Sequence, residues 1–337
     1  MIVALAPFYF YPPKFGGAER IYNLLSRLEE PVHVLYPDIQ NHYEELGNMT
    51  IEAVRIDADM VDERINDWDL KLARHAMRLF RKRIVELNPE VVILEHPWQV
   101  EAIPKGTKFF YDAHNNETQL KRELFGQEIA RAAEHYEKKA LKADGIAYCS
   151  KNDDIDGHYI PNGTNLPSVT VGSGFESNKL IFIGSGHPPN VKAAHNLALW
   201  GKHLDYEIEI AGTCSEVIEP EGNVKTLGKL EDTDEFFRSA FAFVNLMEQG
   251  SGTSLKVIRA MSYGLPVIST EIGARGFSEG CIIVDSVENV KAVLQKLENR
   301  NEYLKQSLQS LKVAEGYSWD KIGKNFSKAV RSVYESR

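Results

Sequence analysis

The chain reads Glu248-Gln-Gly-Ser-Gly-Thr-Ser-Leu-Lys-Val-Ile-Arg-Ala-Met-Ser-Tyr-Gly-Leu-Pro-Val-Ile-Ser-Thr270 in its most informative stretch. This order is typical of a strand that ends in a glycine loop, followed by a helix, a glycine stop and a second strand. Gly250 and Gly252 allow the backbone to turn tightly and to approach a ligand closely. Gly264 is placed to end the helix. The stretch therefore predicts part of an α/β domain built on a parallel sheet.

The beginning of this helix is a candidate phosphate site. Thr253 or Ser254 can cap the helix, and the backbone N–H groups of its first turn attract anions because they have no partner within the helix. Lys256 lies in the first turn, where a cation opposes the helix dipole unless a bound diphosphate reverses the sign of that interaction. The alternative is an ordinary turn with a solvated lysine, and both interpretations stay open on these residues alone.

The same alternation of short apolar runs and amphipathic stretches extends along the chain in both directions. The predicted strands are 2–6, 32–36, 91–95, 108–112, 145–149, 180–183, 207–211, 242–245, 266–269 and 281–284. The predicted helices include 18–29, 70–87 and 117–142. A turn signal and a polar Gly/Ser stretch at about 160–178 separate the two series. We expect two Rossmann-like domains, which bind ligands at the carboxyl ends of their strands.

Composition excludes several classes of protein. The chain has 337 residues, of which 43% are hydrophobic, so each of two domains can bury a core. The net charge of −9 argues against a nucleic-acid-coating protein. Cys149, Cys214 and Cys281 are too scattered for a disulfide framework or a zinc cluster. The apolar N-terminal run is too short for a signal peptide, and no run reaches the ~18 residues of a membrane span, so we expect a cytoplasmic protein.

Residues 248–270 resemble the donor-site signature of the retaining GT-B glycosyltransferases often called family 4, in the subgroup with a GSGTxLKxxEAMxxGxPVxST pattern. Further resemblances follow in the family's order at 15–20, 112–117, 160–163, 182–192 and 318–320. The resemblance implies a GT-B fold with two domains facing across a cleft. It assigns residues 1–160 and a C-terminal helix at about 318–337 to the acceptor side, and residues 161–317 to the nucleotide-sugar side.

The resemblance also implies a reaction. A hexose-like sugar would pass from a nucleotide diphosphate sugar to a glycan or lipid-linked acceptor, with retention and with neither metal nor cofactor. His114, at the end of a predicted strand, would be the catalytic residue that positions the sugar. The alternative for His114 is a structural place beside a helix cap, because Asn115 and Asn116 are good N-caps. The implied donor-binding residues are Gly16, Gly17, Gly184, Lys192, Ser251, Gly252, Thr253, Ser254, Leu255, Lys256 and Arg259.

Residue 259 departs from the family pattern. The family has a glutamate there that binds the donor ribose, whereas Arg259 offers no hydrogen-bond acceptor to a ribose diol. Two alternatives to a working transferase therefore stay open. One is a catalytically degenerate nucleotide-sugar-binding or regulatory subunit of glycosyltransferase descent, and the other is a sugar-nucleotide epimerase of the same fold.

Residues 71–83 form a basic amphipathic stretch in a chain that is acidic overall. Basic amphipathic helices bind anionic lipid surfaces, so the stretch predicts a peripheral contact with the inner face of a membrane. The alternative is a crossover helix of an α/β domain, which also needs one apolar stripe for its sheet and one charged face for water.

Substitution of Gly252 tests the predicted phosphate loop. We expect Gly252→Val to abolish nucleoside diphosphate binding without unfolding the domain, because a side chain would fill space that the phosphate needs. Calorimetry with the nucleotide, together with circular dichroism of the variant, measures both quantities. Undiminished affinity in a folded variant would contradict the prediction.

Overall fold

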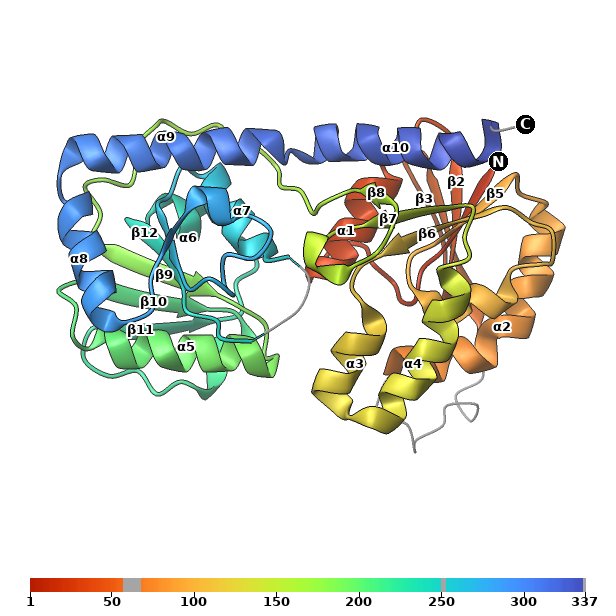
Figure 1. Ribbon diagram of the computed structural model, residues 1–337, viewed down its shortest axis with the longest axis horizontal. Helices are drawn as coiled ribbons and strands as arrows, with labels where there is room; N and C mark the ends of the chain where they lie inside the picture. Colours follow the sequence, from red (N-terminus) through yellow and green to blue (C-terminus); the bar gives the residue numbers. More distant parts are fainter. Residues whose placement is uncertain (57–67, 250–252, 336–337) are drawn as a thin grey trace. The chain divides into compact units, whose positions relative to one another are not determined.

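The computed structural model describes residues 1–56, 68–249 and 253–335, without the side chains of residues 68–76 and Asn152. The chain divides into two compact units (Figure 1). Unit 1 comprises Met1–Asn162 with Trp319–Arg337, and unit 2 comprises Gly163–Ser318. Each unit is a Rossmann-like α/β layer structure, which confirms the predicted fold class.

Unit 1 is built on a sheet in which all pairs of neighbouring strands are parallel except the pair at one edge. Its two central strands are buried along their whole length because helices cover both faces of the sheet, which explains their uninterrupted apolar sequences. In spatial order the strands are β3 (Tyr43–Leu46), β4 (Met49–Arg55), β2 (Val32–Asp38), β1 (Ile2–Leu5), β5 (Val91–Leu94), β6 (Phe109–Ala113), β7 (Gly145–Tyr148) and β8 (His158–Tyr159).

The helices of unit 1 include one correction to the sequence prediction. The helix expected over 117–142 is two helices, because Gly126 between them has a φ of +83°, which interrupts the helical backbone. The C-terminal helix joins unit 1, where Phe326 packs edge-on against Phe110 with 5.6 Å between ring centroids. The helices are α1 (Gly16–Leu25), α2 (Trp68–Leu87), η2 (Pro97–Ala102), α3 (Glu117–Phe125), α4 (Gln127–Ala140), η3 (Lys151–Asp153) and α10 (Trp319–Glu335).

Unit 2 has a fully parallel sheet with a continuous apolar core. In spatial order its strands are β11 (Val224–Gly228), β10 (Glu207–Ala211), β9 (Lys179–Ile183), β12 (Ala242–Asn245), β13 (Val267–Ser269) and β14 (Cys281–Ile283). Its helices are α5 (Pro188–Gly201), η4 (Thr213–Val217), α6 (Asp234–Arg238), α7 (Leu255–Ser262), η5 (Ser278–Gly280), α8 (Val287–Leu297) and α9 (Arg300–Gly316).

Four strands of the structure were not predicted from the sequence, namely β3, β4, β8 and β11. Three of them are edge strands, and β4 is the neighbour of the edge strand β3. Each is short or mixes polar with apolar residues, because one side of an edge strand faces water. The apolar runs that the prediction relied on are a property of the buried central strands.

The basic stretch at 71–83 lies on α2, whose later residues pack as a crossover helix. Phe80 and Ile84 are fully buried in the core of unit 1. Arg83 forms ion pairs with Glu52 at 2.9 Å and with Glu86 at 3.1 Å, so its charge is largely neutralised. The side chains of residues 71–76 lie outside the described residues, so the membrane contact stays a prediction. Within the described ranges, every helix is too short or too polar to span a bilayer.

Candidate active site

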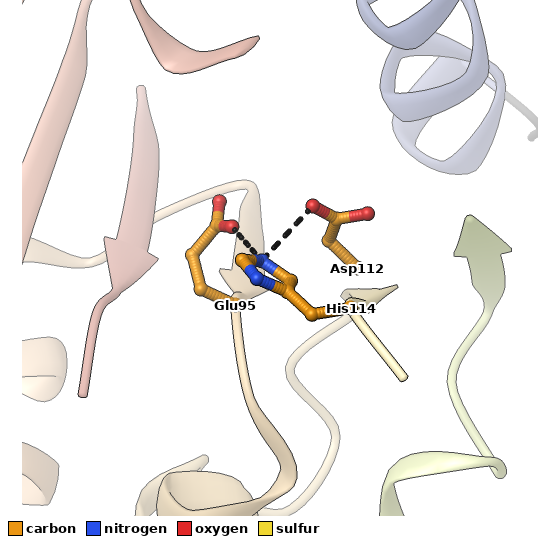
Figure 2. A group of neighbouring side chains, drawn as sticks. All are labelled: Glu95, Asp112 and His114. Atoms are coloured by element: carbon orange, nitrogen blue, oxygen red, sulfur yellow. Dashed lines mark hydrogen bonds and ion pairs between the residues drawn. The ribbon is translucent and has the colours of Figure 1, made fainter. Parts of the chain in front are cut away.

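The carboxyl ends of β5 and β6 bring three titratable side chains together in unit 1 (Figure 2). His114 Nε2 lies 3.1 Å from Glu95 Oε2 and 3.4 Å from Asp112 Oδ2. Both carboxylates are fully buried, and His114 is 7% exposed. Since adjacent parallel strands end at the same edge of a sheet, residues that follow them in sequence converge there. His114 therefore has two acidic partners rather than a place in a solvated loop.

Arg20 of α1 neutralises one of these carboxylates. Its Nε and Nη2 donate to the two oxygens of Asp112 at 2.9 and 2.5 Å. Its Nη1 donates to the carbonyl oxygen of Ile160 at 2.9 Å and to Asn162 Oδ1 at 3.1 Å. Such a bidentate, planar pairing is the strongest form of arginine–carboxylate contact. Arg20 thereby fixes α1, the end of β6 and the end of the N-terminal segment of unit 1 to one another.

The pKa values of the three groups diverge because their surroundings differ. Burial raises the pKa of Glu95 to about 7, although the hydrogen bond from His114 acts in the opposite direction. Burial acts on Asp112 in the same way, but the charge of Arg20 and the hydrogen bond with His114 outweigh it and hold the pKa of Asp112 well below its usual range. Burial lowers the pKa of His114, yet hydrogen bonds to Asp112 and Glu95 leave that pKa raised.

Glu95, Asp112 and His114 also present one ligand atom each within 4.8 Å of one another, as a metal site would. However, Arg20 already occupies both oxygens of Asp112. A divalent cation would sit beside this guanidinium in a region of low dielectric constant, where like charges repel strongly. The arrangement favours hydrogen bonding to a protonated imidazole over metal binding.

In unit 2 the predicted phosphate lysine has a surrounding of its own. The Lys256 ammonium donates to Asn190 Oδ1 and lies over the Phe182 ring, 4.9 Å from its centroid. Burial lowers the pKa of Lys256 to about 8, and the positive charge of Arg275 acts in the same direction. Within the described ranges, no carboxylate forms an ion pair with Lys256. The side chain is therefore a half-buried cation whose charge no carboxylate of the described residues neutralises, so an anion could bind to it.

Gly184 and Lys192, two other predicted donor-binding residues of unit 2, have different surroundings. Gly184 is required for packing, since a Cβ there would lie only 2.9 Å from Cβ of Asn190, the residue that accepts from Lys256. Lys192 forms an ion pair with Glu248 at 2.7 Å, and both side chains are about half exposed. Lys192 is thus a surface cation with its own partner, and the choice between it and Lys256 as the phosphate ligand favours Lys256.

α7 begins at Leu255, which confirms that a helix starts within residues 253–256. Ser254 is the N-cap of α7, but its buried Oγ makes no hydrogen bond among the described residues. Its backbone N–H donates to the carbonyl of Arg275 at 3.3 Å, which ties Ser254 to the turn that follows β13. Leu255 packs against the core of unit 2. Gly250, Ser251 and Gly252 lie outside the described residues, so their role stays a prediction.

The remaining predicted positions are structural in their visible contacts. The Arg259 guanidinium lies 5.6 Å from the centroid of the Phe237 ring, and its charge also acts on Asp234. Gly16 is the first residue of α1, and Gly17 lies against the Phe8 and Phe15 rings. These glycines bring the helix start close to aromatic side chains.

Sequence reasoning did not single out Arg20, Glu95 or Asp112. Arg20 and Asp112 stand inside the segments 15–20 and 112–117 that carried the resemblance, so the signal was present. Glu95 had one signal of its own, a carboxylate at the end of a predicted strand that is otherwise apolar. A charge that follows an apolar strand is exposed or paired, and the sequence does not say with which residue it pairs.

Comparisons with known proteins agree with the fold of both units. Residues 177–299 match the family described as Glycosyl transferases group 1. No curated protein matches the chain. Among solved structures, a sucrose-phosphate synthase from Thermosynechococcus elongatus is similar at 12% identity and a TM-score of 0.76, with 100% of this chain and 99% of that chain covered.

Two further structures are similar over 98% of this chain and 99% of their own. One is an α,α-trehalose-phosphate synthase from Burkholderia xenovorans, with 11% identity and a TM-score of 0.69. The other is HepE of Anabaena, solved with UDP and glucose, with 13% identity and a TM-score of 0.71. At identities this low, the structural similarity establishes only the fold, which is GT-B. With the family match over residues 177–299 of unit 2, this fold supports a glycosyltransferase.

The buried ion pair at Arg20 gives a prediction of stability with a control just beyond the end of the same helix. We expect Arg20→Ala to lower the free energy of unfolding by roughly 3–5 kcal/mol, because it leaves Asp112 charged and buried without its partner. Arg27→Ala removes a contact with the largely exposed Asp320 and should cost about 1 kcal/mol or less. Urea denaturation followed by circular dichroism measures both, and equal losses would show that the buried pair has no special weight.

Proposed function

We propose that this glycosyltransferase moves a hexose-like sugar from a nucleotide diphosphate sugar to a glycan or lipid-linked acceptor, with retention and without metal. The observation that carries the proposal is Lys256, a half-buried cation that has no acidic partner among the described residues. The resemblance to the family 4 signature supports retention. The net charge of −9 gives no support to nucleic acid as a partner.

The chemistry needs an anion site of this kind. Cleavage of the anomeric C–O bond places positive charge on the sugar and negative charge on the departing diphosphate. Lys256 and the N–H groups of the first turn of α7 would stabilise that negative charge, because fixed donors in a partly dry site interact with it more strongly than water does. A bound diphosphate would in turn raise the pKa of Lys256 from its depressed value and keep the side chain charged.

His114 supplies the second part of the proposal. Its ring is almost buried, and two carboxylates orient it. Those contacts hold the imidazole in one position, as a residue that holds the transferred sugar requires. The cytoplasm is the expected location, with residues 71–83 as the proposed peripheral contact with the inner membrane face if the acceptor is lipid-linked.

Because of Arg259, the experiment must also test the alternative of a regulatory subunit without turnover. Arg259 packs on Phe237 and offers no acceptor to a ribose. A degenerate subunit would bind the nucleotide sugar without turnover, and an epimerase would convert the donor without an acceptor. Rates of donor consumption measured with and without candidate acceptors separate these outcomes from transfer.

Two lysine variants test the donor site directly. We expect Lys256→Met to weaken nucleoside diphosphate binding by at least roughly tenfold, because a charge-assisted contact to phosphate is lost. Lys192→Met, the matched control, should change affinity by less than about threefold, since its surface pair with Glu248 contributes little. A thermal-shift screen with uridine, guanosine and adenosine diphosphates selects the nucleotide, and calorimetry gives the affinities. A larger loss in the Lys192 variant would reverse the assignment.

A third variant separates the sugar from the nucleotide. We expect His114→Ala to lower turnover of the donor sugar roughly 100-fold while nucleotide affinity changes little, because Lys256 and α7 belong to unit 2 and His114 to unit 1. Donor consumption and calorimetry are measured on the same preparation. Turnover at the wild-type rate would make His114 a structural residue.

A further inference from the structure

We propose that Glu95 is a positioning residue that, together with Asp112, holds His114 through Nε2–H and keeps the ring in its protonated form, so that Nδ1–H is the group that donates to the sugar. The proposal rests on the proposed function of His114 and names the atom and the supporting group through which it acts. Asp112 and His114 lie in segments that the sequence singled out, whereas nothing in the sequence assigns a role to Glu95.

Geometry fixes which nitrogen carries the proton. Nε2 lies within hydrogen-bond distance of Glu95 and close to Asp112, and an ionised carboxylate can only accept. Asp112 stays ionised because Arg20 binds both of its oxygens, so at least one acceptor faces Nε2 at every pH near neutrality. In the neutral ring the proton is therefore on Nε2. Within the described ranges, Nδ1 makes no hydrogen bond with the protein.

The two carboxylates differ in what else they hold. Asp112 spends most of its acceptor capacity on Arg20. Glu95 has a hydrogen bond only with His114 among the described residues, and its Oε1 is buried without any partner. Burial of a carboxylate that makes a single hydrogen bond lowers the stability of the fold. The role of Glu95 therefore lies in that one contact with His114. An apolar residue would lose this contact, and a glutamine could still accept a hydrogen bond from Nε2 but would not place a negative charge beside the ring.

Every charged or titratable group around the ring bears on its protonation. Asp112 and Glu95 favour the imidazolium, while Arg20 opposes it. The His96 ring is centred 4.4 Å from that of His114, and the Cys149 thiol donates to the His114 carbonyl oxygen at 2.9 Å. Burial raises the pKa of that thiol, so it stays neutral. Among the residues that the structure describes, the two carboxylates are the only negative charges in direct contact with the ring.

These charges determine the state of Nδ1. The pKa of His114 is raised, so the ring stays protonated to higher pH than a free histidine and Nδ1 carries a proton. As the pH rises through about 7, Glu95 ionises and strengthens this preference. Nδ1–H can then donate to a sugar hydroxyl oxygen. At still higher pH the ring loses the Nδ1 proton and can only accept there, so activity should fall on the alkaline side.

Replacement of Glu95 by glutamine tests the role with almost unchanged shape. We expect Glu95→Gln to lower the pKa of His114 by about 1–2 units, because the nearest removable negative charge is gone. The alkaline limb of the turnover–pH profile should move to lower pH by the same amount, and turnover at pH 8 should fall roughly tenfold or more. Nucleotide affinity should not change. Nitrogen-15 NMR of the histidines gives the pKa and the tautomer, and donor consumption gives the profile.

Glu101→Gln is the matched control. Glu101 pairs with His135 at the same distance of 3.1 Å, but both side chains are substantially exposed. Its removal should leave the His114 pKa and the turnover profile unchanged, which separates a general loss of negative charge from the specific contact of Glu95.

Each outcome has a defined meaning. An unchanged His114 pKa and profile in a folded Glu95→Gln variant would overturn the proposal. Should that variant fail to fold, the wild-type protein still decides, because a neutral His114 with its proton on Nδ1 contradicts the geometry. If His114→Ala retains full turnover while the NMR result stands, the proposed function of His114 fails and the positioning by Glu95 does not.

Discussion

The bidentate pair between Arg20 and Asp112 is the contact on which unit 1 depends. It places a guanidinium and a carboxylate in a region almost without water, where each charge would be very costly alone. Arg20 uses its remaining donors on Ile160 and Asn162, so one side chain ties together a helix, the end of a central strand and the end of the N-terminal part of the chain. Because Asp112 is neutralised in this way, its neighbours can hold a further proton between them.

Units 1 and 2 treat charge in opposite ways. In unit 1 the buried charges balance within the protein, with Arg20 against Asp112 and His114 against Glu95. In unit 2 the half-buried cation Lys256 rests on an amide oxygen and an aromatic ring. A balanced cluster holds a side chain in one position, whereas an unbalanced cation attracts an anion. In the proposed function these are the two tasks of transfer from a diphosphate donor, one for the sugar and one for the leaving group.

The prediction of the fold succeeded where the chain is buried on all sides. Central strands such as β1 and β5 are continuous apolar runs because helices cover both faces of the sheet, and that property is visible in the sequence. Edge strands such as β3 and β11 carry polar residues that face water, so their sequences resemble loops. The break at Gly126 was also missed, because the sequence alone does not tell a glycine inside a helix from one whose φ is positive.

For the functional site, the sequence by itself determined the residue types and their order. The glycine loop, Lys256 at a helix start and His114 after a strand can all be found from local patterns, because a short stretch of backbone fixes where they stand. The tertiary structure alone decided the partners. Glu95, Asp112 and Arg20 come from three elements distant in sequence, and only the sheet brings them within hydrogen-bond distance of one another or of His114. The tertiary structure also distinguishes the two lysines, because Lys192 forms an ion pair with Glu248 whereas Lys256 donates to an amide oxygen. Charge balance is a property of neighbours in space, and sequence patterns record only neighbours along the chain.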